Sequence, residues 1–127
     1  HAVINGASTH PPIDLRAGVP RRFRFINISP LESHNVQLVS GGTVQSWRAL
    51  AKDGADLSPQ QAVSVPSTLQ LHPGETYDFE VLRAKPESLT LRVSSPETIQ
   101  VRRTFMAKGV LREALPRVTT EIPVTVR

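Results

Sequence analysis

The four histidines are the residues of this chain best suited to metal chemistry, and they lie far apart. They are His1, His10, His34 and His72, so no His-x-His pair occurs, and the chain contains no cysteine. Redox metals are held by several converging imidazole or thiolate groups. These residue types and spacings predict no metal site within the chain, and we assign no metal-ligating or cofactor-binding residue.

Motifs for other kinds of catalysis are also missing from the sequence. Serines are present, but no Gly-x-Ser-x-Gly elbow occurs that would activate one as a nucleophile. There is no glycine-rich phosphate loop. Acidic residues are scattered across expected turns and strand faces, so the sequence defines no acid–base pair. We assign no catalytic residue and predict that the chain alone is not an enzyme.

Arginine supplies most of the net charge of +4 and is concentrated at Arg21, Arg22 and Arg24 and at Arg102 and Arg103. Such clusters can form a phosphate-binding surface. We favour cationic side chains on solvent-facing strands, where they also discourage edge-to-edge pairing, because acidic residues are interspersed with them. These are Asp14, Glu32, Asp53, Asp56, Glu75, Asp78 and Glu80. Aromatic residues are too few for a base-stacking platform, so no nucleic-acid partner is expected.

The chain is expected to be one domain, residues 1–127, because its length suits a single core. No stretch approaches the roughly 20 apolar residues of a membrane span, so no membrane partner is expected. No basic start followed by an apolar run marks a signal peptide. The abrupt start favours a domain excised from a larger multidomain protein, with His1 as a cloning remnant.

Turn-forming residues divide the chain into short runs, which is typical of an all-β sandwich or barrel. Eleven prolines and seven glycines supply these breaks. Between them, alternating apolar residues predict strands with one buried face. Those faces consist of Tyr77, Phe79 and Val81; of Leu89, Leu91 and Val93; and of Val118, Ile122, Val124 and Val126.

Three other stretches are less regular. Phe23 and Phe25 alternate with arginines, but Ile26 and Ile28 have the opposite parity. Either a bulge near Phe25-Ile26 or burial of both faces would explain this. Residues 46–52 and 108–115 are each expected to form a helical turn or two, limited by nearby prolines. Residues 53–66 form the longest expected loop, with residues 62–65 extended inside it.

Three segments in order carry a family pattern. The first includes VING at 3–6, PPIDLRAG at 11–18 and RFRFINI at 22–28; the second is WRALAKDGAD at 47–56; the third is LQLHPGETYDFEV at 69–81. Together they resemble the second cupredoxin-like (plastocyanin-like) domain of multicopper oxidases, over most of residues 3–94. The resemblance implies a Greek-key β-sandwich of the cupredoxin type.

Turns within these segments also have a direct physical explanation. Asn5-Gly6 suits a tight hairpin turn, because both residues tolerate a positive φ. Pro73-Gly74 suits the centre of a type II turn. Asp53-Gly54 suits a turn in which the aspartate caps nearby backbone N–H groups.

The resemblance also implies where copper ligands would lie. In cupredoxins the first histidine is early in a strand, and the cysteine, second histidine and methionine follow in the loop between the last two strands. His34-Asn35-Val36 resembles the first-ligand strand. We expect the last two strands at 98–106 and 118–126, and the loop 107–117 holds no cysteine or histidine. Met106 alone is a weak axial partner, so the domain is expected to be copper-free.

The remaining candidates have simpler roles. His34 is expected to meet a backbone group or water, and His10 and His72 are expected to be exposed. Trp47 is expected to be a packing residue whose indole N–H reaches a carbonyl.

The family implies a structural domain of a multicopper oxidase. Copper would lie in neighbouring cupredoxin domains of the same polypeptide, which are the expected partners. The parent enzyme would couple substrate oxidation to dioxygen reduction in the periplasm or outside the cell. Two alternatives stay open. One is a stand-alone binding module that uses residues 53–66 and Gly41-Gly42. The other is a copper-free oxidase relative with a scaffold role in the cell envelope.

Overall fold

The regular structure of the chain is all-β. A computed structural model describes residues 3–95, 99–103, 110–114 and 118–127, and no helix occurs among them. Within the same residues, no helix is long and apolar enough to span a membrane. The strands are β1 (Ile13–Leu15), β2 (Arg21–Ile26), β3 (His34–Ser40), β4 (Thr43–Val44), β5 (Ser46–Lys52), β6 (Ala55–Asp56), β7 (Ser64–Pro66), β8 (Thr68–Leu71), β9 (Thr76–Val81), β10 (Glu87–Ser94), β11 (Ile99–Arg103), β12 (Val110–Ala114) and β13 (Thr119–Val126).

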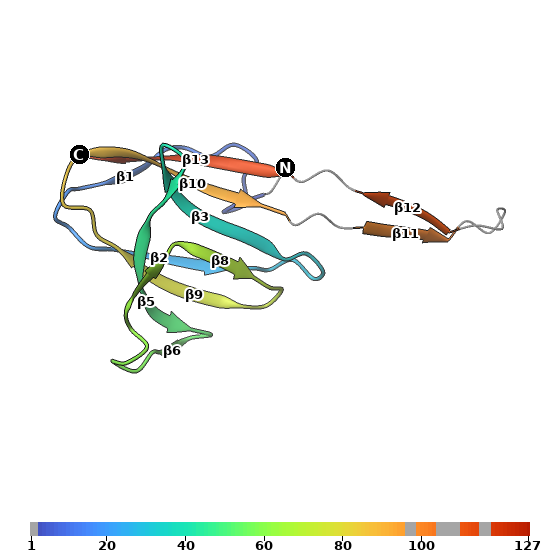
Figure 1. The fold of residues 1–127 in the computed structure, drawn as a ribbon, viewed down its shortest axis with the longest axis horizontal. Helices are drawn as coiled ribbons and strands as arrows, with labels where there is room; N and C mark the ends of the chain where they lie inside the picture. The colour runs from blue at the N-terminus through green and yellow to red at the C-terminus, as the bar shows by residue number, and fades with distance from the viewer. Residues whose placement is uncertain (1–2, 96–98, 104–109, 115–117) are drawn as a thin grey trace.

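Two larger sheets form the body of the molecule. The first has the order β1-β13-β10-β3-β4, with β8 also paired to β3, and the second has the order β2-β9-β5-β6, with β7 also paired to β5. Only the β1–β13 pair is parallel among the described strand pairs of these sheets. Figure 1 shows the two sheets as separate layers, consistent with a β-sandwich.

The core lies between these layers and takes side chains from both. Val36, Leu38 and Val124 come from the first sheet, and Trp47 and Val81 come from the second. The predicted apolar faces of β9, β10 and β13 are confirmed, because their alternate residues enter this cluster or pack against it. Val118 is an exception. It precedes β13 and is exposed, so the alternation begins later than predicted.

Both explanations proposed for the irregular alternation of apolar residues 23–28 are wrong. The register of β2 with β9 is unbroken to the Ile26–Thr76 pair, so there is no bulge near Phe25. Both faces are not buried either, because Ile26 is 57% and Ile28 is 91% exposed. The irregularity in this sheet lies instead in β5, between Ala49 and Ala51.

The two predicted helical turns are wrong where the structure describes them. Residues 46–52 form β5, held between β9 and β7. This sequence is rich in residues with good helix propensity, and tertiary pairing overrides that weak preference. In the second segment, Val110–Ala114 forms β12. The rest of residues 108–115 lies outside the described residues.

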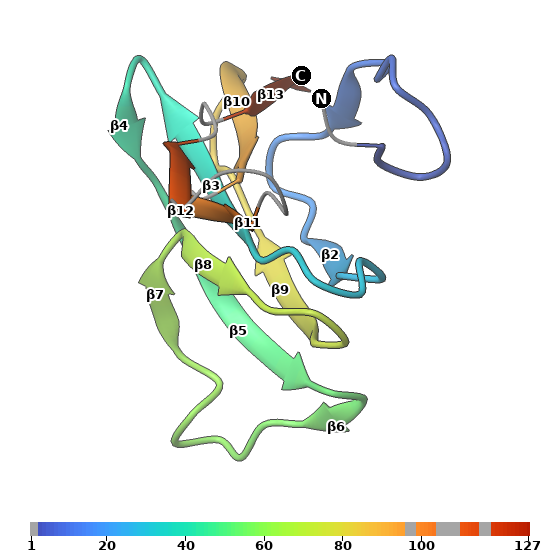
Figure 2. The same cartoon turned by 90° about the vertical axis from the view of Figure 1, so that its right-hand side faces the viewer.

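The prediction that residues 98–106 and 118–126 form the last two strands is wrong in one respect, because a further strand, β12, lies between them. β13 pairs directly with β10, and β11 pairs with β12 as a separate hairpin. The expected loop 107–117 therefore contains a strand. Figure 1 shows this hairpin extending beyond the two sheets, and in Figure 2 it points toward the viewer. Met106 lies outside the described residues.

The predicted turns at Asn5-Gly6 and Asp53-Gly54 form, and the Asp53 Oδ1 accepts from the Thr76 N–H of β9 at 3.0 Å. Asn5 and Gly6 have φ values of 52° and 76° between the bridged residues Ile4 and Ala7. Asp53 and Gly54 have φ values of 49° and 79°. They join β5 to β6, and β7 supplies the extended stretch expected inside the long loop.

The Pro73-Gly74 turn is confirmed as well. Gly74 has a φ of 79°. The turn closes with a hydrogen bond from the Glu75 N–H to the His72 carbonyl at 3.1 Å.

Candidate functional site

The described histidines take part in no group of three or more potential metal ligands. His34 begins β3 and pairs in register with Leu71 of β8. His72 follows that leucine, so the alternation of side chains places it on the opposite side from His34. His72 is exposed, as predicted, and its Nδ1 lies 2.9 Å from the Ser33 hydroxyl. His1 lies outside the described residues.

The donor groups present do not fit a copper site. His34 is a single imidazole, and the sequence offers no thiolate to join it. Among the described residues, no group of three or more histidine or carboxylate side chains is placed to hold a metal ion. Tight copper binding needs several such donors in a defined geometry. We therefore derive no copper chemistry from this chain.

His10 differs from the prediction that it is exposed. It is half-buried, and its Nε2 is buried without a hydrogen-bond partner in the part of the chain that the structure describes. It immediately precedes the Pro11-Pro12 segment that runs into β1. Because β1 pairs with β13, the histidine is held near the sheet rather than in a free loop.

Trp47 is the packing residue that was predicted. It is buried, and its ring stacks on Phe79 with centroids 4.3 Å apart and also meets Phe25 at 5.5 Å. The predicted carbonyl partner is wrong, because the Trp47 Nε1 is buried with no acceptor among the described residues. The two rings that it contacts, those of Phe25 and Phe79, carry no acceptor oxygen.

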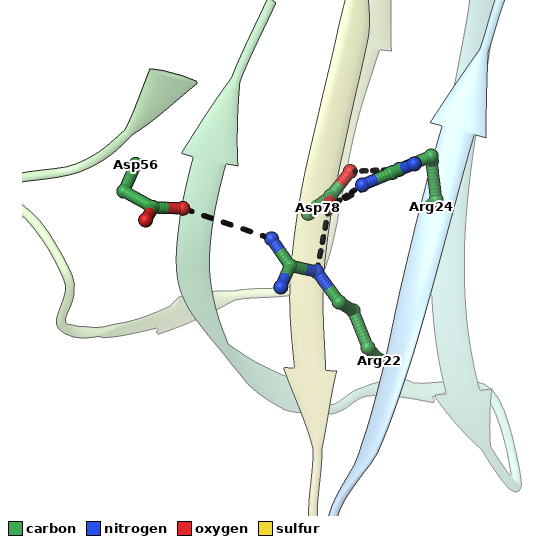
Figure 3. Close-up of polar contacts among 4 residues, drawn as sticks. All are labelled: Arg22, Arg24, Asp56 and Asp78. Carbon is green, nitrogen blue, oxygen red and sulfur yellow. Dashed lines mark hydrogen bonds and ion pairs between the residues drawn. The ribbon is translucent and has the colours of Figure 1, made fainter. Parts of the chain in front are cut away.

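The most concentrated set of charges lies on the outer face of the second sheet. Register between β2 and β9 sets Arg24 opposite Asp78 and Arg22 opposite Glu80. Asp78 is only 2% exposed, although its strand neighbours Phe79 and Tyr77 face the other side of the sheet. Figure 3 shows both arginines directed at its carboxylate.

Short hydrogen bonds connect these three side chains. The Arg22 Nε donates to Asp78 Oδ2 at 2.6 Å, and the Arg24 Nε and terminal nitrogen donate to the two oxygens at 3.0 Å each. The Asp78 side chain is 3% exposed, whereas the side chains of Arg22 and Arg24 are 50% and 59% exposed. Ala51, opposite Asp78 in β5, is small and leaves room for this arrangement.

Charge pairing keeps Asp78 ionised. The hydrogen bond from Arg24 lowers the pKa of this carboxyl below its ordinary value, and Arg22 acts in the same direction. Burial opposes them, because it disfavours the charged form, but the net pKa shift is downward. The same contact raises the pKa of Arg24.

Most other charges nearby are paired too. Arg48 makes a bidentate contact with Glu80, at 3.2 and 3.1 Å. Arg22 also approaches Asp56, at 3.9 Å between two exposed side chains. Arg22 and Arg24 thus lie on the solvent-facing side among acidic residues, as predicted. The side chains of Arg102 and Arg103 lie outside the described set.

Asn27 connects several backbone segments, a role that its sequence context does not predict. Its buried side-chain amide donates to the carbonyls of Glu32 at 2.7 Å and Leu71 at 3.0 Å. Its Oδ1 accepts from the Ser29 N–H at 2.9 Å, and its backbone carbonyl accepts from Gly74 at 2.8 Å. These bonds fasten the β2–β3 connection to the β8–β9 turn.

This connection holds apolar side chains in solvent. Ile28 is 91% and Leu31 is 89% exposed, on a segment whose backbone Asn27 anchors. The alternation of apolar residues in the sequence breaks at Ile28, but it does not indicate whether this side chain is buried or exposed.

Comparison with known proteins leaves the chain without an assigned family. No family model matches the sequence, and no curated protein matches it.

Proposed function

We propose that this chain is a copper-free, cupredoxin-like structural domain of a multicopper oxidase, most like the second domain. The observation that carries the proposal is that the three family-like segments coincide with strand and turn units. Residues 3–28 contain the Asn5-Gly6 turn, β1 and β2. Residues 47–56 contain all but the first residue of β5, its turn and β6. Residues 69–81 contain all but the first residue of β8, the Pro73-Gly74 turn and β9.

The strand order supports a Greek-key topology. In both sheets most neighbours are distant in sequence, such as β3 with β10 and β2 with β9. The chain must therefore pass repeatedly from one sheet to the other, as it does in Greek-key sandwiches. The shared core of the two sheets supports the same interpretation.

The lone imidazole at His34 supports a structural role. In the proposed parent protein, copper in neighbouring cupredoxin domains would oxidise the substrate and reduce dioxygen. This domain would hold those neighbours in position by packing against them. The family implies export to the periplasm or the cell exterior.

The coding sequence on both sides of these residues tests the proposal. We expect flanking cupredoxin domains that carry His-x-His motifs. A gene that encodes this domain with no oxidase domain beside it would contradict the proposal and favour a stand-alone binding module. Flanking domains without His-x-His motifs would also contradict it and would favour a scaffold relative.

A further inference from the structure

Strand β2 forms one edge of the second sheet. It is the end strand of the order β2-β9-β5-β6 and pairs only with β9 in the described part of the chain. Figure 3 shows this order directly, with the strand of Asp78 between that of the arginines and the next strand of the sheet. With six residues, β2 is longer than the edge strand β1, which has three.

The alternation of hydrogen bonds between β2 and β9 shows which backbone groups of β2 do not pair with β9. The Asn27 N–H donates to the Glu75 carbonyl at 3.1 Å and continues the β2–β9 ladder. In an antiparallel pair, alternate residues direct both their N–H and C=O groups toward the partner strand. Phe25 and Phe23 therefore share the direction of Asn27.

The alternate residues of β2 direct their backbone groups away from β9. These residues are Arg22, Arg24 and Ile26. No turn or loop hydrogen bond in the described part of the chain reaches their backbone. The edge therefore presents unpaired backbone donors and acceptors at three alternate positions.

The side chains of the same three residues are accessible. Both arginine side chains are half-exposed or more, and Ile26 is 57% exposed. Because they alternate along the strand, they share one face beside the free edge. Two cationic positions are thus followed by an apolar one.

The charge beside this edge is incompletely balanced. Among the carboxylates that the structure describes, Asp78 alone is in close contact with both Arg22 and Arg24. Asp56 approaches Arg22 only at 3.9 Å and is itself exposed. An incoming strand with carboxylates opposite the two arginines would form favourable cross-strand pairs.

Charge repulsion also disfavours the binding of a second copy of this chain at the β2 edge. Pairing two β2 strands centred on Phe23 or Arg24 sets arginine opposite arginine. Like charges directly opposite each other destabilise a strand pair. A partner with acidic side chains avoids this repulsion.

We propose that the free edge of β2 binds an extended segment of another polypeptide by strand addition. The segment pairs with the backbone of Arg22, Arg24 and Ile26. It carries carboxylates opposite the two arginines and an apolar side chain opposite Ile26. Main-chain hydrogen bonds supply affinity in such complexes, and alternate side chains supply specificity. This inference goes beyond the proposed function and holds whether or not the parent protein is an oxidase.

A designed peptide tests the proposal. In antiparallel pairing, the peptide Thr-Val-Thr-Glu-Thr-Glu-Thr sets valine opposite Ile26 and the glutamates opposite Arg24 and Arg22. Titration of the isotope-labelled chain, followed by NMR, should shift the amide signals of these residues and slow their hydrogen exchange. A control peptide with lysine in place of glutamate should bind at least tenfold more weakly. Equal affinity for the two peptides, or shifts confined to another strand, would overturn the proposal.

Two variants separate edge pairing from loss of the fold. Ile26→Pro removes an outward N–H that makes no bond to β9, so the ladder remains and peptide binding should fall at least tenfold. Arg24→Gln should weaken binding severalfold, whereas Arg92→Gln, which alters a pair with Glu121 on the other sheet, should not. Thermal unfolding checks that each variant is folded. If Arg24→Gln leaves the affinity unchanged, the proposal is wrong.

Analytical ultracentrifugation of the chain alone tests whether a second copy of the chain occupies this edge instead of an acidic segment. We expect a monomer that binds the acidic peptide. A dimer that dissociates in the Ile26→Pro variant and excludes the peptide would identify a second copy as the occupant and would overturn the acidic-segment proposal.

Discussion

Asp78 is an ionised side chain that is buried on the outer face of a sheet. Three short hydrogen bonds from Arg22 and Arg24 satisfy its oxygens. A buried charge is tolerated only when it is paired and hydrogen-bonded in this way. The contact joins β2 to β9 through side chains, in addition to the backbone ladder.

Removing this charge should weaken the second sheet. Asp78→Asn keeps the size of the side chain but loses the charge-assisted hydrogen bonds. We expect the free energy of unfolding to fall by about 1.5–3 kcal/mol, the range for hydrogen bonds to charged groups. Urea denaturation measures it. Asp14→Asn is the matched control, because Asp14 meets Arg127 in an exposed pair at 3.5 Å. Equal losses in the two variants would contradict this role for Asp78.

The pH dependence of stability follows from the lowered pKa of Asp78. A depressed pKa in the folded state stabilises the protein above the unfolded-state pKa, about 3.9 for aspartate. That contribution is lost as the pH falls from there through the lower folded-state value. The stability difference between the native chain and Asp78→Asn should therefore be constant near neutral pH and shrink below about pH 4. A difference that stays constant down to pH 2 would show that Asp78 is not the group involved.

Asn27 controls the shape of the β2–β3 connection. Asn27→Ala removes its bonds to Glu32, Leu71 and Ser29 and leaves those backbone groups without a partner. We expect a loss of about 1–3 kcal/mol in unfolding free energy and faster amide exchange in residues 28–33. Hydrogen-exchange mass spectrometry measures the second effect. Unchanged exchange in this segment would contradict the anchoring role.

Among the structural elements, those that depend on adjacent residues are predicted best from the sequence. The Asn5-Gly6, Asp53-Gly54 and Pro73-Gly74 turns depend on the φ preferences of adjacent residues, and all three form. Strand β10 was also predicted correctly, because simple alternation decides which of its residues face the core.

Elements decided by distant contacts were predicted less well. Strand β5 has helix-favouring residues and becomes a strand through pairing with β9. The pairing of β13 with β10 depends on partner choice, which alternation does not encode. Asn27 acquires its role from Leu71, 44 positions away. Local pattern therefore predicted the all-β class, but not the candidate site.

The β8–β9 turn gives a direct test of backbone conformation. Gly74 has a φ of 79°, and a methyl group added there would meet no atom within 4 Å. Gly74→Ala should therefore cost about 1–2 kcal/mol through backbone strain alone. Gly74→Asn is the matched variant and should recover part of the loss, because asparagine tolerates this conformation. Urea denaturation measures both variants, and an alanine variant as stable as the native chain would contradict the assignment.

At the scale of the molecule, two sheets enclose a core that has no cysteine to cross-link it. The outer surface carries a charged cluster of arginines with Asp78 and two exposed apolar side chains, Ile28 and Leu31. Among the described residues, histidine and carboxylate side chains form no group of three or more that could hold a metal ion. We propose that these surfaces, and not a metal centre, carry the function of the domain.

Copper binding tests this central claim most directly. The purified chain is exposed to Cu(II) and to Cu(I), dialysed against a weak chelator and examined for metal by mass spectrometry. We predict far less than one copper per chain, with no change in the His34→Ala variant. One tightly held copper per chain, lost in the His34→Ala variant, would contradict the claim.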